Sequence, residues 1–195
     1  MDKIAAFVQE HIADDTAKLI LSRSKWPEID MDLAVACIES RKKLKNKVQD
    51  WFCRPELIFP VRLSAEQCSS SATAAYKARF AASIGGEGFK IADLTGGLGV
   101  DSWYFSKFAS QVLYNEMQES LCVAAKHNFK ALSSENISVT NHKIEPESEN
   151  LQKILTDFQP DIVFMDPARR SETGKKVFLI EDCSPDVLTL RSDIF

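Results

Sequence analysis

Apolar positions follow two different periods along the chain, and the change falls at Gly85–Gly86. Before these glycines, apolar residues recur every three to four positions, as in Ile4, Phe7 and Val8. This spacing places apolar side chains on one face of a helix. The sequence therefore predicts a helical region over residues 1–84. Its short apolar faces favour a layer that packs on the rest of the chain over an independent domain.

Polar residues within this region mark expected helix starts. Asp30 or Asp32 precedes a long helical pattern, and a short acidic side chain can accept hydrogen bonds from the first free amides of a helix. Ser64 and Gln67 have the spacing of a capping box. A further helix is expected over residues 72–84, ended by the glycine pair.

After the glycines, short apolar runs alternate with helical patterns of about ten residues. Such alternation favours parallel strands joined by right-handed helical crossovers. The sequence thus predicts an α/β fold over residues 85–195. The expected strands cover 89–94, 111–115, 137–140 and 162–165, and the expected helices cover 100–109, 120–132 and 150–158.

The segment Ile91-Ala-Asp-Leu-Thr-Gly-Gly-Leu-Gly-Val-Asp101 joins the first expected strand to its helix. Three glycines within four residues allow a ligand to approach the backbone closely. Glu116 ends the next apolar run, where a carboxylate could accept two hydrogen bonds from a ribose diol. Ser102 occupies the last glycine position of the dinucleotide fingerprint, which disfavours an NAD-dependent oxidoreductase.

Composition narrows the class of protein. The chain has 195 residues, 45% of them hydrophobic, and a net charge of −4, so no global charge favours nucleic acid. No apolar run reaches the ~20 residues that cross a bilayer, and the N-terminus lacks a secretion signal. Five scattered cysteines without a Cys-x-x-Cys pair favour a reducing, cytoplasmic location. The histidines have no partners at ligand spacing, so no metal site is expected.

Three segments together indicate a family. The glycine segment, Glu116 and Asp166-Pro-Ala-Arg169 resemble the class I S-adenosylmethionine-dependent methyltransferases. The stretch Glu66-Gln-Cys-Ser-Ser-Ser-Ala-Thr-Ala-Ala-Tyr-Lys-Ala78 is similar to a bacterial branch whose members carry a C-terminal THUMP-like domain. The resemblance implies a Rossmann-like parallel sheet, here truncated after about four strands, with the N-terminal helical layer before it. The remaining strands would lie beyond Phe195.

The resemblance also implies S-adenosyl-L-methionine as the cofactor. In the family the glycine loop passes under the methionine part, and Asp93 would orient its amino group. Asp101 could hold a water or that amino group, Glu116 matches the ribose acid, and Met117 could pack on adenine. The third strand departs from the family, because Asn141–Lys143 stands where an aspartate often contacts adenine. The residues predicted to bind cofactor are Asp93, Thr95 (in place of a glycine), Gly96, Gly97, Gly99, Asp101, Glu116 and Met117.

The same resemblance assigns catalysis to Asp166, Pro167 and Arg169. A carboxylate or carbonyl at this strand end can orient a substrate amine or accept its proton. Arg169 stands where amino-methylating relatives have a base-stacking aromatic, and arginine can stack or grip phosphate. Nucleic acid is therefore the expected substrate, RNA rather than DNA. Because strands beside the fourth would be missing, we expect this chain alone to be inactive.

The sequence leaves alternatives open for the function of the chain and for the roles of several residues. The chain could be a cofactor-binding module without catalysis. Cys183 could be a nucleophile or a loop cysteine before a helix cap, and the basic run 41–47 could be a solvated helix face or an RNA contact. Residues 69–71 could contact the cofactor or only start a helix. The apolar fourth strand could pair with a second copy or be covered by residues 177–195.

Overall fold

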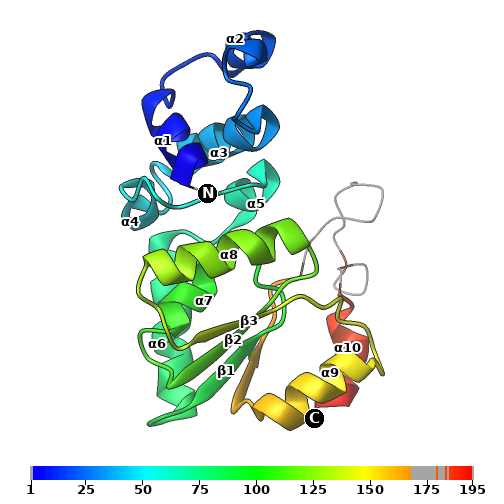
Figure 1. The fold of residues 1–195 in the computed structure, drawn as a ribbon. Coiled ribbons are helices and arrows are strands. Elements are labelled where there is room, and N and C mark those ends of the chain that lie inside the picture. The colour runs from blue at the N-terminus through cyan, green and yellow to red at the C-terminus, as the bar shows by residue number, and fades with distance from the viewer. Residues whose placement is uncertain (1, 168–178, 180–182, 184, 195) are drawn as a thin grey trace.

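A four-stranded parallel sheet forms the centre of the molecule in the computed structural model, which describes residues 2–167, 179, 183 and 185–194 (Figure 1). Its strand order is β3-β2-β1-β4, so β1 lies between the second and the fourth strand. Three of the strands are apolar on both faces, as expected for a parallel sheet that helices cover on both sides. The strands are β1 (Lys90–Asp93), β2 (Gln111–Asn115), β3 (Ile137–Thr140) and β4 (Ile162–Phe164).

Helices cover both faces of this sheet (Figure 1). One face packs α6 (Ser71–Gly85), α7 (Val100–Phe105) and α8 (Glu119–Ala131) against side chains such as Ile91 and Val112. The other face packs α9 (Glu149–Lys153), η2 (Ile154–Phe158) and α10 (Val187–Ile194) against their neighbours Ala92 and Leu113. The chain therefore has an α/β Rossmann-like fold, as the sequence predicts.

The N-terminal helices form a layer above α8 (Figure 1). They share apolar cores with the sheet domain, because Trp51 and Phe59 belong to one buried cluster with Phe89 and Ile91. A second cluster joins Phe7 and other residues of this layer to Ala124 of α8. A domain boundary at residue 84 stays a prediction. The elements are α1 (Asp2–Glu10), α2 (Thr16–Leu21), η1 (Arg23–Lys25), α3 (Met31–Leu44), α4 (Gln49–Phe52) and α5 (Arg62–Gln67).

Helix caps agree with the sequence in one place and differ in another. Asp30 caps α3 by accepting a hydrogen bond from the Leu33 amide at 3.1 Å. The predicted capping box at Ser64 and Gln67 is wrong, because Ser64 lies inside α5 and does not precede it. Ser70 instead caps α6, accepting from the Thr73 amide at 3.2 Å. Several serines in a row give the same local signal, and only packing selects the one that caps.

The basic run 41–47 is not a uniformly solvated helix face, because its first residue is buried. Arg41 is 4% exposed. Its guanidinium donates to the backbone carbonyls of Phe52, Arg54, Pro55 and Leu57 at 2.7–3.3 Å. These carbonyls belong to the last residue of α4 and to the segment without regular structure that follows it. The arginine therefore satisfies buried backbone acceptors that no helix or sheet could satisfy.

The fourth strand forms one edge of the sheet, pairing only with β1 among the described residues. The α10 helix covers one face beside it through Leu190, which is fully buried. Pairing of this edge with a second copy stays a prediction. No helix in the described part of the chain has the length and apolar character to cross a bilayer.

Candidate functional site

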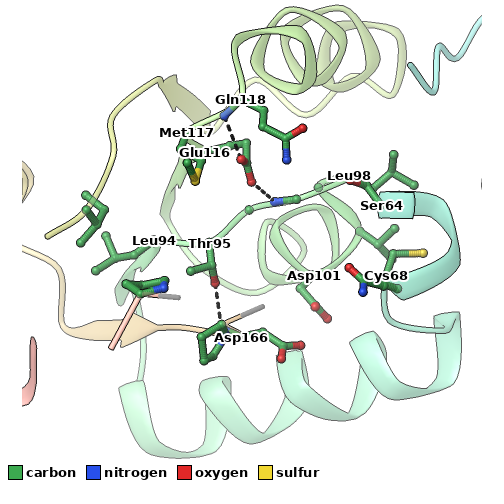
Figure 2. Close-up of a pocket in the computed structure, with 18 of the residues that line it drawn as sticks. Ser64, Cys68, Leu94, Thr95, Leu98, Asp101, Glu116, Met117, Gln118 and Asp166 are labelled. Atoms are coloured by element: carbon green, nitrogen blue, oxygen red, sulfur yellow. Dashed lines mark hydrogen bonds between the residues drawn. The ribbon is translucent and has the colours of Figure 1, made fainter. Parts of the chain in front are cut away.

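A pocket of about 640 Å³ lies at the carboxyl edge of the sheet, above β1 and its two neighbours (Figure 2). The strand order reverses at β1, and open α/β sheets bind ligands at such a point. Residues of the glycine loop form its floor. The walls come from the α5–α6 connection, from the ends of β2 and β4, and from the segment after β3. The lining includes Ser64, Cys68, Ser69, Thr95, Gly96, Gly97, Gly99, Asp101, Glu116, Met117, His142, Asp166 and Pro167.

The glycine loop is fixed by contacts that only glycine permits. Gly97 and Gly99 have φ angles of 53° and 91°, in the left-handed region. Gly96 donates its amide to the Asn115 carbonyl at 2.7 Å. A Cβ atom on Gly96 would lie 2.2 Å from the buried ring of Tyr114, which also donates to the Gly97 carbonyl at 2.6 Å. The loop therefore lies directly on the Tyr114 ring.

Glu116 lies against this loop (Figure 2). Its Oε2 accepts the Gly97 amide at 2.9 Å, and its Oε1 accepts the Gln118 amide at 2.9 Å. A carboxylate has about four acceptor positions, so two remain for a ligand. Met117, beside it on the pocket wall, is 56% exposed. The structure thus brings the predicted ribose acid and the glycine loop together, while the ribose role itself stays a prediction.

Two asparagines brace this wall, and sequence reasoning missed their role. Asn141 donates to the carbonyls of Glu116 at 2.7 Å and Met117 at 3.0 Å. Asn115 donates to the carbonyls of Leu94 at 3.2 Å and His142 at 3.0 Å. The segment after the third strand therefore sets the shape of the pocket. In the sequence, the position of both asparagines at the ends of neighbouring strands could have indicated this role. The carbonyls to which they donate are mostly distant in sequence and could not be identified from it.

Asp93 does not line the pocket wall; it lies beneath the loop with 1% of its surface exposed. Its carboxylate accepts the Thr95 amide at 3.1 Å and the Ser102 hydroxyl at 2.6 Å. Burial raises the pKa of Asp93 to about 7, with a smaller contribution from the charge of Asp101, despite these hydrogen bonds. The described contacts hold the loop to α7, and direct contact of Asp93 with the cofactor stays a prediction.

Asp101 faces the pocket and is joined to a lysine that sequence reasoning did not select. Its Oδ2 accepts from Ser69 Oγ at 2.9 Å and from Lys77 Nζ at 3.0 Å. Burial by itself lowers the pKa of Lys77, but the hydrogen bonds and charges of Asp101 and Asp166 outweigh it, so the pKa lies above its ordinary value. Lys77 is therefore a cation at neutral pH. The stretch that carries the resemblance, residues 66–78, includes this lysine and could have indicated it.

Asp166 lies at the carboxyl end of β4, and Pro167 lines the same wall. The Asp166 amide donates to Thr95 Oγ1 at 2.7 Å, which gives a role to the threonine that stands in place of a glycine (Figure 2). The Asp166 carboxylate accepts from Lys77 at 3.1 Å. Arg169 lies outside the described residues.

The cysteines differ in their relation to the pocket. Cys68 lines it, but burial raises the pKa of its thiol to about 11, which keeps it protonated at neutral pH. Cys183 is half-buried and is not among the described residues that line the pocket, and the choice between a nucleophile and a loop cysteine stays open. Within the described ranges, no three His, Cys, Asp or Glu side chains are grouped as metal ligands.

Comparison with known proteins gives a similar structure. A crystal structure of a "putative methyltransferase" from Porphyromonas gingivalis W83 has a TM-score of 0.78 and 31% sequence identity, covering 98% of this chain and 45% of that one. This chain thus spans less than half the length of that protein. No protein-family model and no curated protein matches the chain.

Two further structures have a weaker similarity to this chain. A "putative methyltransferase" from Streptococcus mutans in complex with SAH has a TM-score of 0.39 and 16% identity, covering 61% of this chain and 62% of that one. An rRNA methylase from Streptococcus thermophilus has a TM-score of 0.32 and 19% identity, covering 34% of this chain and 37% of that one. These scores are too low for the sites to be compared residue by residue.

Proposed function

We propose that this chain binds S-adenosyl-L-methionine in the pocket and forms the cofactor-binding part of a methyltransferase that acts on RNA. One observation carries the proposal: the Gly97 amide lies 2.9 Å from the Glu116 carboxylate, which sets a glycine loop opposite an acid able to hold a ribose. The 31% identity to the Porphyromonas gingivalis protein supports methyl transfer as the chemistry.

The pocket residues fit the parts of this cofactor. Glu116 keeps acceptor positions for a ribose diol, and the exposed Met117 offers an apolar surface for adenine. Asp101 Oδ1 is buried and has no hydrogen-bond partner, so it could accept the ammonium of the methionyl end. The volume of about 640 Å³ lies in the usual range for small-molecule sites.

When bound, the cofactor supplies a methyl group on a positively charged sulfur, and the acceptor must approach that carbon in line. Asp166 is 57% exposed at the rim, where its carboxylate can orient an acceptor amine or take its proton. RNA as the acceptor rests on the resemblance at residues 166–169, with Arg169 to stack on a base or grip a phosphate. A cytoplasmic place of action belongs to the same proposal.

Calorimetric titration with S-adenosylmethionine, S-adenosylhomocysteine and NAD tests the cofactor. We expect the first two to bind and NAD not to bind. Binding of NAD alone would refute the proposal. A second assay follows transfer of a labelled methyl group to RNA, and we expect none from this chain by itself. Cofactor binding without transfer to RNA is also what a non-catalytic binding module would give.

Replacement of Glu116 by alanine should weaken binding of S-adenosylhomocysteine by about 2 kcal/mol, because it removes a charged acceptor. It also leaves the Gly97 and Gln118 amides without their partner, so the variant should melt at a lower temperature. Glu119→Ala is a matched control, since Glu119 is an exposed acid on the same segment and does not line this pocket. Unchanged affinity in a folded Glu116→Ala protein would contradict the ribose role.

A further inference from the structure

Lys77 lies at the junction of three segments that form the pocket. Its Nζ is 2.9 Å from Ser69 Oγ, 3.0 Å from Asp101 Oδ2 and 3.1 Å from Asp166 Oδ2. An ammonium group has three donors, and all three are thus engaged. Its charge also lies 4.9 Å from the centre of the Phe164 ring. The lysine is held in one place from α6, behind the pocket wall.

The two carboxylates that Lys77 contacts lie on the same side of the pocket but have different surroundings (Figure 2). Asp101 is 13% exposed and also accepts from Ser69, whereas Asp166 is 57% exposed. Among the described residues, Lys77 is the side chain that donates a hydrogen bond to the Asp166 carboxylate. Without the lysine, the Asp166 side chain would be free to turn into solvent.

Charges in this part of the site do not balance. Asp101 and Asp166 bring two negative charges within hydrogen-bond distance of one positive charge. The Asp101 Oδ1 atom, which is buried and without a partner, is where a second cation would complete the balance. An ammonium group bound there would lie close to Lys77, and two like charges at such a distance repel.

We infer that Lys77 is a positioning residue that fixes the Asp166 carboxylate at the acceptor end of the pocket and, through Asp101, reduces the affinity for a ligand ammonium at the cofactor end. The inference rests on the proposed function. Lys77 has no free donor for a ligand carboxylate and does not line the pocket among the described residues. It therefore acts through the two aspartates and not by direct contact.

Two ligands separate this effect from damage to the fold. S-adenosylhomocysteine carries the amino acid end, whereas 5′-methylthioadenosine has the adenine, ribose and sulfur without it. In Lys77→Met, S-adenosylhomocysteine should bind about five- to tenfold more tightly, because one nearby positive charge is gone. Methylthioadenosine should bind as it does to the wild type. Lys77→Arg should match the wild type with both ligands, since it keeps the charge.

Asp166→Asn gives a second, independent measurement, and its exposed position makes it a mild change to the fold. The change removes one negative charge, so that Lys77 pairs with Asp101 alone and its positive charge repels the ligand ammonium more strongly. S-adenosylhomocysteine should therefore bind about five- to tenfold more weakly, again without an effect on methylthioadenosine. Lys107→Met is the control for loss of a lysine, because Lys107 lies over the Trp103 ring at 3.7 Å and away from the pocket.

Each result has a defined meaning. Weaker binding of S-adenosylhomocysteine alone by Lys77→Met would mean that the lysine contacts the ligand, and would overturn the inference. Equal changes for both ligands, or no change for either, would overturn it too. If the wild type binds neither ligand, the proposed function itself fails. Tighter binding of only the ligand with an ammonium would support the inference, because a general structural defect does not raise affinity selectively.

Discussion

Gly96→Ala should lower the free energy of unfolding by about 3 kcal/mol and abolish cofactor binding. The new Cβ would lie 2.2–2.7 Å from three atoms of the Tyr114 ring, which is fully buried and packs against Phe129. Overpacking of this kind usually costs about 1–3 kcal/mol. Moving the ring would also break the hydrogen bond from Tyr114 to the Gly97 carbonyl, which adds about 1 kcal/mol.

Gly88→Ala is the matched comparison for this change. Gly88 has a φ of 74° and no atom within 4 Å of a built Cβ, so alanine there brings backbone strain and no clash. That strain costs about 1 kcal/mol. Urea denaturation of the two variants should therefore separate them by roughly 2 kcal/mol. Equal stability would show that the Tyr114 ring can move freely, and would refute the account of the loop.

The pKa of Asp93 predicts that stability falls as pH rises. Its value is about 7 in the folded protein, against 3.8 for an ordinary aspartate. Between these values the folded protein binds a proton that the unfolded chain has lost, so the free energy of unfolding decreases with pH. The decrease is complete above about pH 7. From pH 5 to pH 8 this single group should remove about 3 kcal/mol.

Asp93→Asn isolates this effect, because asparagine has the same shape and no charge. Its side-chain oxygen can still accept the Thr95 amide, and its amide can donate to the Ser102 hydroxyl, which turns to accept. Urea denaturation at pH 5 and pH 8 should show the drop of about 3 kcal/mol only in the wild type. The contributions of other titrating groups to the change in the free energy of unfolding are the same in both proteins and cancel in the comparison. A drop of the same size in Asp93→Asn would refute the assignment to this carboxyl.

Much of the fold follows from local sequence. The second and third strands have the bounds that the sequence predicts, and the second, which lies inside the sheet, carries the continuous apolar run that burial on both faces requires. The glycine loop and Glu116 each follow a strand, and the carboxyl ends of adjacent parallel strands lie at one edge of a sheet. The Gly97–Glu116 hydrogen bond is the direct result of that rule.

Other features depend on contacts between residues far apart in the chain. Arg41 belongs to a basic run, but its guanidinium is buried because the end of α4 and the segment after it present backbone carbonyls to it. The direction in which a charged helix residue points depends on what packs beside it, which periodicity alone does not encode.

The site itself divides in the same way. The glycines, Glu116 and Asp166 reach the site because each follows a strand directly in the sequence. The link from Lys77 to Asp101 and Asp166 spans 24 and 89 residues, so it exists only once α6 packs beside α7 and β4. Burial likewise gives Asp93 its raised pKa, because desolvation is a property of the surrounding fold and not of the residue. The sequence by itself thus determines which groups reach this edge of the sheet, and the tertiary structure decides how they are paired and charged.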